Sequence, residues 1–175
     1  AIAAALADRG IGTLRYQFPY MEEGSRRPDA EPVAIATVRA AIAAVRPHGV
    51  PLIAGGRSFG GRMTSRAAAA GPLEGVAGLA FLGFPLHPAG RPGTSRADHL
   101  DAVPFPMLFL QGTRDTLADL ALLRPVIGRL GARATLHVVE HADHSFHVPK
   151  KSGRDDAGVL DELAGAIAAW REAIP

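Results

Sequence analysis

Short, nearly continuous apolar runs alternate along the chain with longer segments in which apolar residues recur every three or four positions. The short runs are typical of strands buried on both faces, and the longer periodicity is typical of helices. The runs predict five strands, at residues 11–18, 50–54, 76–84, 105–111 and 133–139. The periodic segments predict helices at residues 1–9, 29–46, 59–70, 120–130 and 155–173. This alternation predicts an α/β fold, in which a mostly parallel, doubly wound sheet has helices on both faces.

Proline, glycine and capping residues indicate where the predicted elements end. Asp29 can cap the helix at residues 29–46, and Pro47 and Gly49 would end it. Residues 85–104 are rich in Pro and Gly and leave room only for a short helix. They are too few to form a separate lid domain over the sheet.

The first predicted helix begins without a capping residue. Residue 1 is Ala, and no Ser, Thr, Asp or Asn precedes the helical run. Helices usually start with one of these side chains, and native chains rarely begin inside a helix. We therefore expect residues 1–175 to form a single domain whose N-terminal strands are missing from this sequence.

Composition excludes several classes of site and partner. The 175 residues are 47% hydrophobic and 21% charged, and the net charge of +2 argues against a nucleic-acid partner. The absence of cysteine excludes disulfides, thiolate metal sites and a cysteine nucleophile. No apolar run approaches the ~18 residues of a membrane span, and no signal peptide is recognisable. We therefore expect a cytoplasmic protein with no membrane partner, and we leave its oligomeric state open.

A motif of the form G-x-S-x-G lies between the strand predicted at residues 50–54 and the helix predicted at residues 59–70. It consists of Gly56, Arg57, Ser58, Phe59 and Gly60. Such a strand-to-helix turn is typical of a nucleophile elbow, which raises the Ser hydroxyl above the carboxyl end of the sheet. Because the turn is tight, we expect a Cβ atom at either glycine to collide with the backbone. The Phe59 amide is the expected oxyanion donor.

Two phosphate-binding interpretations of the same glycines fail. A P-loop needs Lys followed by Ser or Thr, whereas Arg62 and Met63 occupy those positions. No G-x-G-x-x-G motif follows the predicted strand, so a dinucleotide site is also excluded. We expect no cofactor.

An acid and a base follow the elbow in the chain order Ser, Asp, His that is typical of this kind of fold. Asp115 comes just after the strand predicted at residues 105–111, and His144 comes just after the strand predicted at residues 133–139. The carboxyl ends of parallel strands meet at one edge of a sheet, so both side chains should lie near Ser58. The pattern predicts a serine hydrolase in which His144 is the base and Asp115 orients it.

Each assignment has an alternative. Asp115 can instead be a turn residue, with Asp119 as the acid, and His141 is the rival base. A cluster of histidines follows the same strand: His137, His141, His144 and His147. Their spacing matches no zinc pattern, so we expect no metal. Tyr20 and Arg57 are candidates for the substrate pocket, with a packed aromatic ring and a surface or supporting arginine as the other interpretations.

At these residues the chain resembles the α/β-hydrolase superfamily, and within it the small lidless branch of hydrolases similar to dienelactone hydrolase. The resembling blocks span most of the chain, at residues 18–21, 55–62, 83–88, 110–115, 142–146 and 151–153. The resemblance implies Ser58, Asp115 and His144 as a catalytic triad that hydrolyses a small acyl substrate, usually an ester. Dienelactone hydrolase itself has Cys at the position of Ser58, so its particular substrate is not implied.

The sequence departs from the family at its beginning. The family's first strands are absent, and so is the glycine-rich loop that supplies a second oxyanion donor. Some relatives in this branch are subunits of chromatin complexes, so the resemblance also allows a non-catalytic protein-interaction module.

Overall fold

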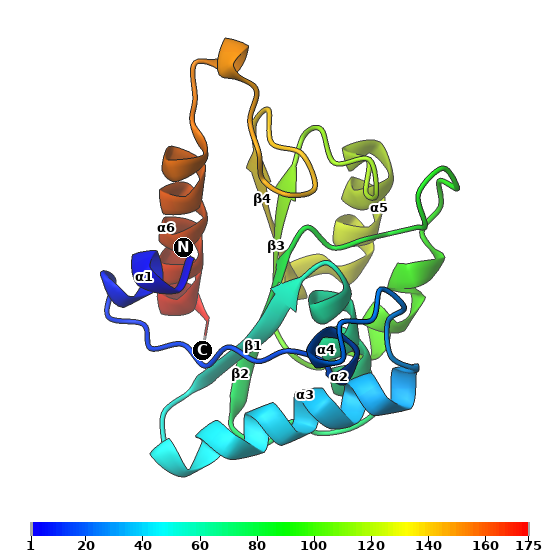
Figure 1. Cartoon of the computed structure of the whole chain (residues 1–175), viewed down its shortest axis with the longest axis vertical. Helices are drawn as coiled ribbons and strands as arrows, with labels where there is room; N and C mark the ends of the chain where they lie inside the picture. The colour runs from blue at the N-terminus through cyan, green and yellow to red at the C-terminus, as the bar shows by residue number, and fades with distance from the viewer. Residues whose placement is uncertain (1, 175) are drawn as a thin grey trace.

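The computed structural model describes residues 2–174, whose strands form a single sheet in the order β1-β2-β3-β4. The strands are β1 (Leu52–Arg57), β2 (Val76–Leu82), β3 (Met107–Gly112) and β4 (Ala134–Val139). Every neighbouring pair is parallel, so the carboxyl ends of all these strands lie at one edge. This arrangement confirms the predicted α/β class (Figure 1).

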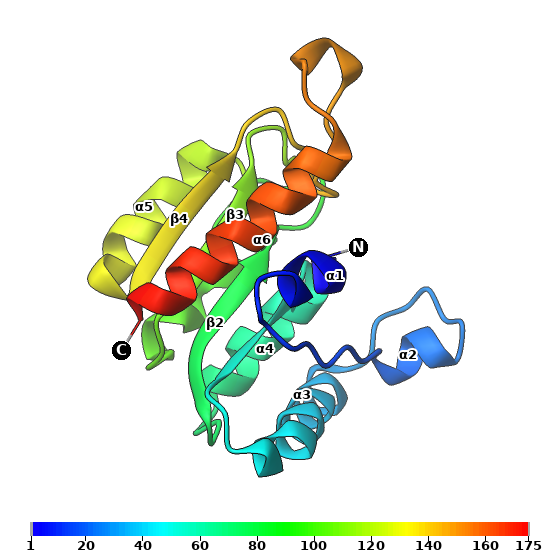
Figure 2. The ribbon, with the colours of Figure 1, turned by 90° about the vertical axis from the view of Figure 1, so that its left-hand side faces the viewer.

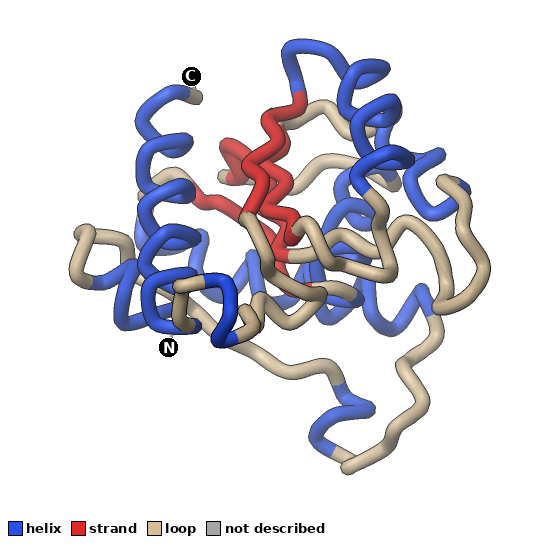
Figure 3. The backbone as a smooth tube through the Cα atoms, turned by 90° about the horizontal axis from the view of Figure 1, so that it is seen from above, coloured by secondary structure: helices blue, strands red, loops and turns tan. Residues whose placement is uncertain are grey.

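Helices cover both faces of the sheet, which Figure 3 shows end on. The α-helices are α1 (Ile2–Ala7), α2 (Pro19–Glu22), α3 (Glu31–Val45), α4 (Phe59–Ala69), α5 (Leu120–Leu130) and α6 (Asp156–Ala173). Short 3-10 helices also occur: η1 (Arg46–His48), η2 (Ser95–Ala102), η3 (Gly131–Arg133) and η4 (Lys150–Ser152). Figure 2 shows α6 lying across one face with α1 beside it, while α3, α4 and α5 cover the other face.

Alternating residues of the strands feed the two halves of the core. In β2, Leu79 and Phe81 pack under α4 and α3, whereas Ala80 faces α6. In β3, Phe109 and Leu110 divide in the same way. Successive strand side chains point to opposite faces, and both faces are covered here. This explains why the strands read as continuous apolar runs rather than alternating ones.

The strand predicted at residues 11–18 is wrong. These residues form an irregular segment that is not part of the sheet, in which β1 pairs only with β2. Leu14 is 53% exposed and Tyr16 is 37% exposed, while Phe18 is buried at the end of the segment. A strand needs a neighbour to satisfy its amides and carbonyls. The apolar residues of this segment resemble those of a strand, but the segment has no such neighbour.

The predicted cap of α3 is also wrong. The N-cap residue is Ala30, which makes no side-chain hydrogen bond to the helix. Asp29 Oδ2 instead accepts a hydrogen bond from the Tyr20 amide at 3.2 Å, and so ties the α2 loop to the start of α3. Pro32 lies in the first turn, where a missing amide leaves one donor fewer to cap.

The segment between β2 and β3 contains the expected short helix, η2, in 3-10 form. Its Ala97 and Leu100 are buried against the core, so the segment is a packed part of the domain. In residues 2–174 no helix has the length and apolar character needed to cross a membrane.

Candidate active site

Ser58 lies at the junction of β1 and α4, at the carboxyl edge of the sheet. Its backbone has φ of +50° and ψ of −114°, a conformation that residues other than Gly rarely adopt. Such a residue costs about 1–3 kcal/mol and persists only where its surroundings hold it. Here the Ser58 amide donates to Leu82 O at 3.1 Å, and Ser58 O accepts from the Arg62 amide at 3.1 Å. The strand-to-helix turn is therefore fixed from both sides.

The crossing of β1 and α4 depends on Gly56 and Gly61. A Cβ atom at Gly56 would lie 3.0 Å from the carbonyl carbon of Gly60, and one at Gly61 would lie 2.7 Å from Gly56 O. At Gly60 the nearest atom would be the Phe18 ring at 3.7 Å, an ordinary contact. The predicted collision at Gly56 is confirmed, whereas that at Gly60 is wrong. The helix approaches the strand one residue later than the motif suggests.

Glycines at the ends of two other strands let the loop that carries His144 settle on the sheet edge. A Cβ atom at Gly112 would lie 2.2 Å from Ala142 O. Gly83 has φ of +67°, and a Cβ atom there would lie 3.3 Å from His144 Nδ1. Asp143 holds the loop by accepting the amides of Ser145 at 2.7 Å and His147 at 3.0 Å. A side chain at Gly83 or Gly112 would therefore displace the loop that holds the His144 imidazole.

The structure brings Ser58, His144 and Asp115 into one hydrogen-bonded chain. Ser58 Oγ lies 2.8 Å from His144 Nε2, and Asp115 Oδ2 lies 2.7 Å from His144 Nδ1. The Asp115 side chain has no exposed surface, and that of His144 is 21% exposed. A carboxylate only accepts hydrogen bonds, so the network assigns the proton to Nδ1. The lone pair on Nε2 then faces the Ser58 hydroxyl and can take its proton.

Asp115 has further donors that sequence reasoning missed. Its Oδ1 accepts the Leu117 amide at 2.8 Å, and its Oδ2 also accepts from Gln111 Nε2. These donors hold the carboxylate in one orientation toward His144. The available signal was Gln111 itself, a polar residue in the otherwise apolar run of β3.

The alternative acid and base lie elsewhere. Asp119 caps α5, because its Oδ1 accepts the Ala121 amide at 2.7 Å. His141 donates its amide to Thr113 Oγ1 at 2.8 Å, and it is His144 that reaches Ser58 Oγ. Asp115, rather than Asp119, is therefore the carboxylate that contacts His144.

The other histidines of the cluster have separate carboxylate partners. His137 Nε2 lies 2.8 Å from Glu162 Oε1, and His147 Nδ1 lies 2.8 Å from Asp156 Oδ2. Within residues 2–174, no three His, Cys, Asp or Glu side chains are grouped so that they could hold a metal ion.

The remaining candidates lie around the elbow. Phe59 begins α4, where backbone amides have no acceptor inside the helix and point toward the end of the sheet. Its ring packs against Phe18 and Tyr20, with centroids 5.2 and 5.9 Å away. Tyr20 is thus a packed aromatic. Arg57 is exposed, and its Nη2 donates to Ser145 Oγ at 2.7 Å, which ties the elbow to the loop of His144.

Comparison with known proteins gives one family and many structures of the same fold. A family model described as an alpha/beta hydrolase domain matches residues 1–172. A serine hydrolase without a lid from Xanthomonas campestris is 27% identical, with a TM-score of 0.72 over 99% of this chain and 72% of that one. Two less similar structures share the fold. These are a serine hydrolase homologue from Coxiella burnetii (19% identity, TM-score 0.69, 96% of this chain and 73% of that one) and an esterase domain from Rhodothermus marinus (15%, 0.72, 99% and 79%).

Proposed function

Because this chain belongs to the alpha/beta hydrolase domain family, we propose that it is a serine hydrolase that cleaves a small ester or a related acyl compound. The proposal assigns the nucleophile to Ser58, the general base to His144 and the orienting acid to Asp115. One observation carries it: the hydrogen-bond chain from Asp115 through His144 to Ser58 Oγ, with distances of 2.7 and 2.8 Å. A hydroxyl activated in this way attacks acyl carbons.

The reaction proceeds in two halves. His144 Nε2 takes the proton of Ser58 Oγ as that oxygen bonds to the acyl carbon, and then gives the proton to the departing alcohol. Water, deprotonated by the same nitrogen, hydrolyses the acyl–Ser58 ester and restores the hydroxyl. Asp115 stabilises the imidazolium that forms in each half. The proposal assigns the oxyanion donor to the Phe59 amide, because it follows the nucleophile at the start of α4.

The surroundings of Ser58 support a small, readily admitted substrate. The segment between β2 and β3, where a lid would rise, holds η2 against α4 instead. The relative from Xanthomonas campestris is likewise described as lacking a lid. We therefore expect esters of short acyl groups to reach Ser58 without any large opening motion.

The test is turnover of 4-nitrophenyl acetate and butyrate by the purified protein. We expect Ser58→Ala to lower kcat/KM by at least about 10³-fold, while Ser25→Ala, in the exposed loop after α2, leaves it unchanged. A Ser58→Ala protein as active as the unmodified one would refute the proposal. A folded protein with no turnover of any ester would favour the non-catalytic interaction module instead.

A further inference from the structure

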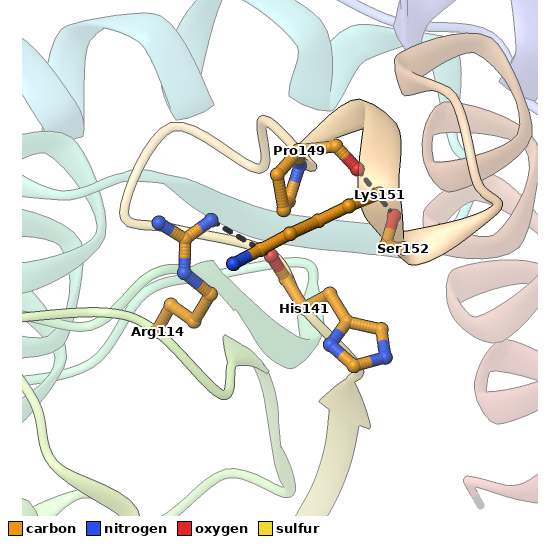
Figure 4. Close-up of a pocket in the computed structure, with 5 residues that line it drawn as sticks. All are labelled: Arg114, His141, Pro149, Lys151 and Ser152. Atoms are coloured by element: carbon orange, nitrogen blue, oxygen red, sulfur yellow. Dashed lines mark hydrogen bonds between the residues drawn. The ribbon is translucent and has the colours of Figure 1, made fainter.

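A hollow of about 300 Å³ opens beside the loop that carries His144. It is lined by Arg114, His141, Pro149, Lys151 and Ser152 (Figure 4). Arg114 directly precedes Asp115, and His141 lies three residues before His144. The remaining lining residues come from η4 and the residue before it. The hollow therefore flanks the same edge of the sheet as the Ser58 site, but it contains none of the three residues assigned there.

Two cations face this hollow, and neither has a carboxylate partner in the part of the chain that the structure describes. Figure 4 shows the Lys151 side chain extending from η4 toward the side of the hollow that Arg114 lines. Arg114 has one hydrogen bond there, a long one of 3.5 Å from Nη1 to His141 O. Within residues 2–174, therefore, no ion pair neutralises either cation.

Glu140, which precedes His141, is exposed, and within residues 2–174 it forms no ion pair with either cation. Four other carboxylates have partners of their own. Their partners are His144 and the Leu117 amide for Asp115, the Ser145 and His147 amides for Asp143, His147 for Asp156, and His137 and Arg154 for Glu162. Two unpaired cations that share a hollow repel each other, and an anion placed between them removes the repulsion. Arg offers a planar fork of N–H donors suited to an oxyanion, and Lys adds a point charge.

We propose that this hollow binds an oxyanion, a carboxylate or a phosphate, between the guanidinium of Arg114 and the ammonium of Lys151. Pro149 and the methylene groups of Lys151 form an apolar wall along which a carbon chain can lie. The oxyanion has two possible sources. It is either a charged group of the ester substrate, which rests on the function proposed above, or a free anion that acts on the His144 loop.

The first experiment measures binding without any catalytic readout. The thermal unfolding midpoint is recorded while inorganic phosphate is raised at constant ionic strength. We expect phosphate to raise the midpoint of the unmodified protein and of Lys150→Met, and to have little effect on Lys151→Met or Arg114→Gln. Lys150 is the matched control, since it is the neighbouring exposed lysine of η4 and does not line the hollow. Equal shifts in all four proteins would overturn the proposal even if the protein is a hydrolase.

The second experiment identifies the source of the anion. It compares 4-nitrophenyl butyrate with 4-nitrophenyl monoesters of dicarboxylic acids, from succinate to suberate. If the anion belongs to the substrate, one monoester length has the highest kcat/KM, and Lys151→Met lowers that preference roughly three- to tenfold, mainly through KM. Phosphate then competes with this monoester only.

If the anion is free, phosphate instead changes the rate on the neutral ester, and it does so in Lys150→Met but not in Lys151→Met. Added salt should weaken either effect, because the hollow is open to solvent. No preference for any charged ester together with no phosphate effect would refute the inference and leave the proposed hydrolysis standing. No turnover of any ester would refute the proposed hydrolysis, and the thermal measurement would still decide whether the hollow binds an anion.

Discussion

Two Ser–His pairs lie within two turns of each other along α4, and their contact distances are the same. Ser58 Oγ is 2.8 Å from His144 Nε2, and Ser65 Oγ is 2.8 Å from His99 Nε2. Ser58 is the first residue of the turn into α4, whereas Ser65 lies inside the helix and is completely buried. The distance between hydroxyl and imidazole therefore does not distinguish a nucleophile from a structural contact.

The two pairs differ in which atom holds the proton. Ser65 Oγ also donates to Arg62 O at 2.8 Å, so it has no proton left for His99 and must accept one from Nε2. His99 Nδ1 is buried and has no hydrogen-bond partner within residues 2–174. Burial, aided by the charges of Arg66 and Arg62, lowers the pKa of His99 to about 4. His99 is thus a neutral donor that fastens η2 to α4.

In the Ser58 pair the direction is reversed by Asp115. The carboxylate accepts a hydrogen bond from Nδ1–H, which leaves Nε2 without a proton and able to accept from the hydroxyl. The comparison shows that the group behind the histidine decides what the serine can do. The predictions that follow alter one pair or the other, in order of decreasing effect.

The largest effect, on kcat, is expected from a substitution that makes the Ser58–His144 pair resemble the Ser65–His99 pair. In Asp115→Asn, the new amide can donate to His144 Nδ1, which moves the imidazole proton to Nε2 and makes it a donor toward Ser58. We expect kcat to fall by about 10⁴-fold, measured on 4-nitrophenyl butyrate. Asp119→Asn is the control, since Asp119 only caps α5, and it should change kcat little. A larger loss with Asp119→Asn would return the acid to that position.

Backbone packing under the first pair should give the next largest effect. Gly61→Ala places a Cβ atom 2.7 Å from Gly56 O, so we expect a loss of about 1–3 kcal/mol in the free energy of unfolding, with reduced turnover. Gly60→Ala meets only the Phe18 ring, and Gly128→Ala in α5 meets nothing within 4 Å. Both should keep or slightly raise stability, by up to about 1 kcal/mol. If urea unfolding finds Gly60→Ala less stable than Gly61→Ala, then β1 and α4 do not cross at Gly61.

The second pair should affect stability toward acid, with no change in kcat. The folded-state pKa of His99 is about 4, below the value of 6.5 for a free imidazole, so the unfolded chain binds the proton first. Stability should therefore fall as the pH drops from about 6.5 toward 4, by roughly 1–2 kcal/mol after allowance for the solvent-exposed part of the ring. His99→Gln should remove this component, whereas His48→Gln at an exposed site should retain it. Unfolding curves that have the same pH dependence in all three proteins would show that His99 titrates normally.

The smallest effect is expected at His147, an exposed histidine three residues after His144. The hydrogen bond that His147 donates to Asp156 raises the pKa of His147, helped by the charges of Asp156 and Asp143 and opposed by desolvation and by the charge of Arg114. The same hydrogen bond, with that from the Val148 amide, lowers the pKa of Asp156. The pair should stabilise the fold at mildly acidic pH and cease to do so as the pH rises through the raised pKa of His147. His147→Ala should thus lower the unfolding midpoint slightly near pH 6 and leave it unchanged near pH 9, and the opposite order would contradict this.

The sequence was sufficient to bring Ser58, Asp115 and His144 together, because each follows a strand of a parallel sheet. Once the order and direction of the strands are given, the carboxyl edge must collect whatever follows them. The structure confirms that the three side chains touch, while their catalytic roles stay a prediction. The sequence also predicted the helices α4, α5 and α6, whose apolar faces and end signals are local.

The predictions that failed concern features that depend on contacts between distant segments of the chain. The apolar residues of 11–18 indicate which side chains avoid water. They do not indicate whether the segment pairs with β1, whose neighbour in the sheet is β2. The angle between β1 and α4 decides which glycine lies where the two elements cross. The close contact with β1 is therefore at Gly61 and not at Gly60, where the motif predicted it. The Gln111–Asp115 contact and the Ser65–His99 pair join residues whose spacing carries no motif. Such pairs are visible only after the chain has folded.

The most direct test of the central claim is to identify the serine that reacts with a fluorophosphonate probe. The unmodified protein is treated with the probe, digested, and analysed by mass spectrometry of the labelled peptide. The reagent reacts with a serine whose proton a neighbouring base can remove, so we predict that it modifies Ser58 and no other serine, and that Ser65→Ala is labelled as fully as the unmodified protein. Labelling at Ser65 or Ser145, or no labelling of a folded protein, would contradict the assignment of Ser58 as the nucleophile.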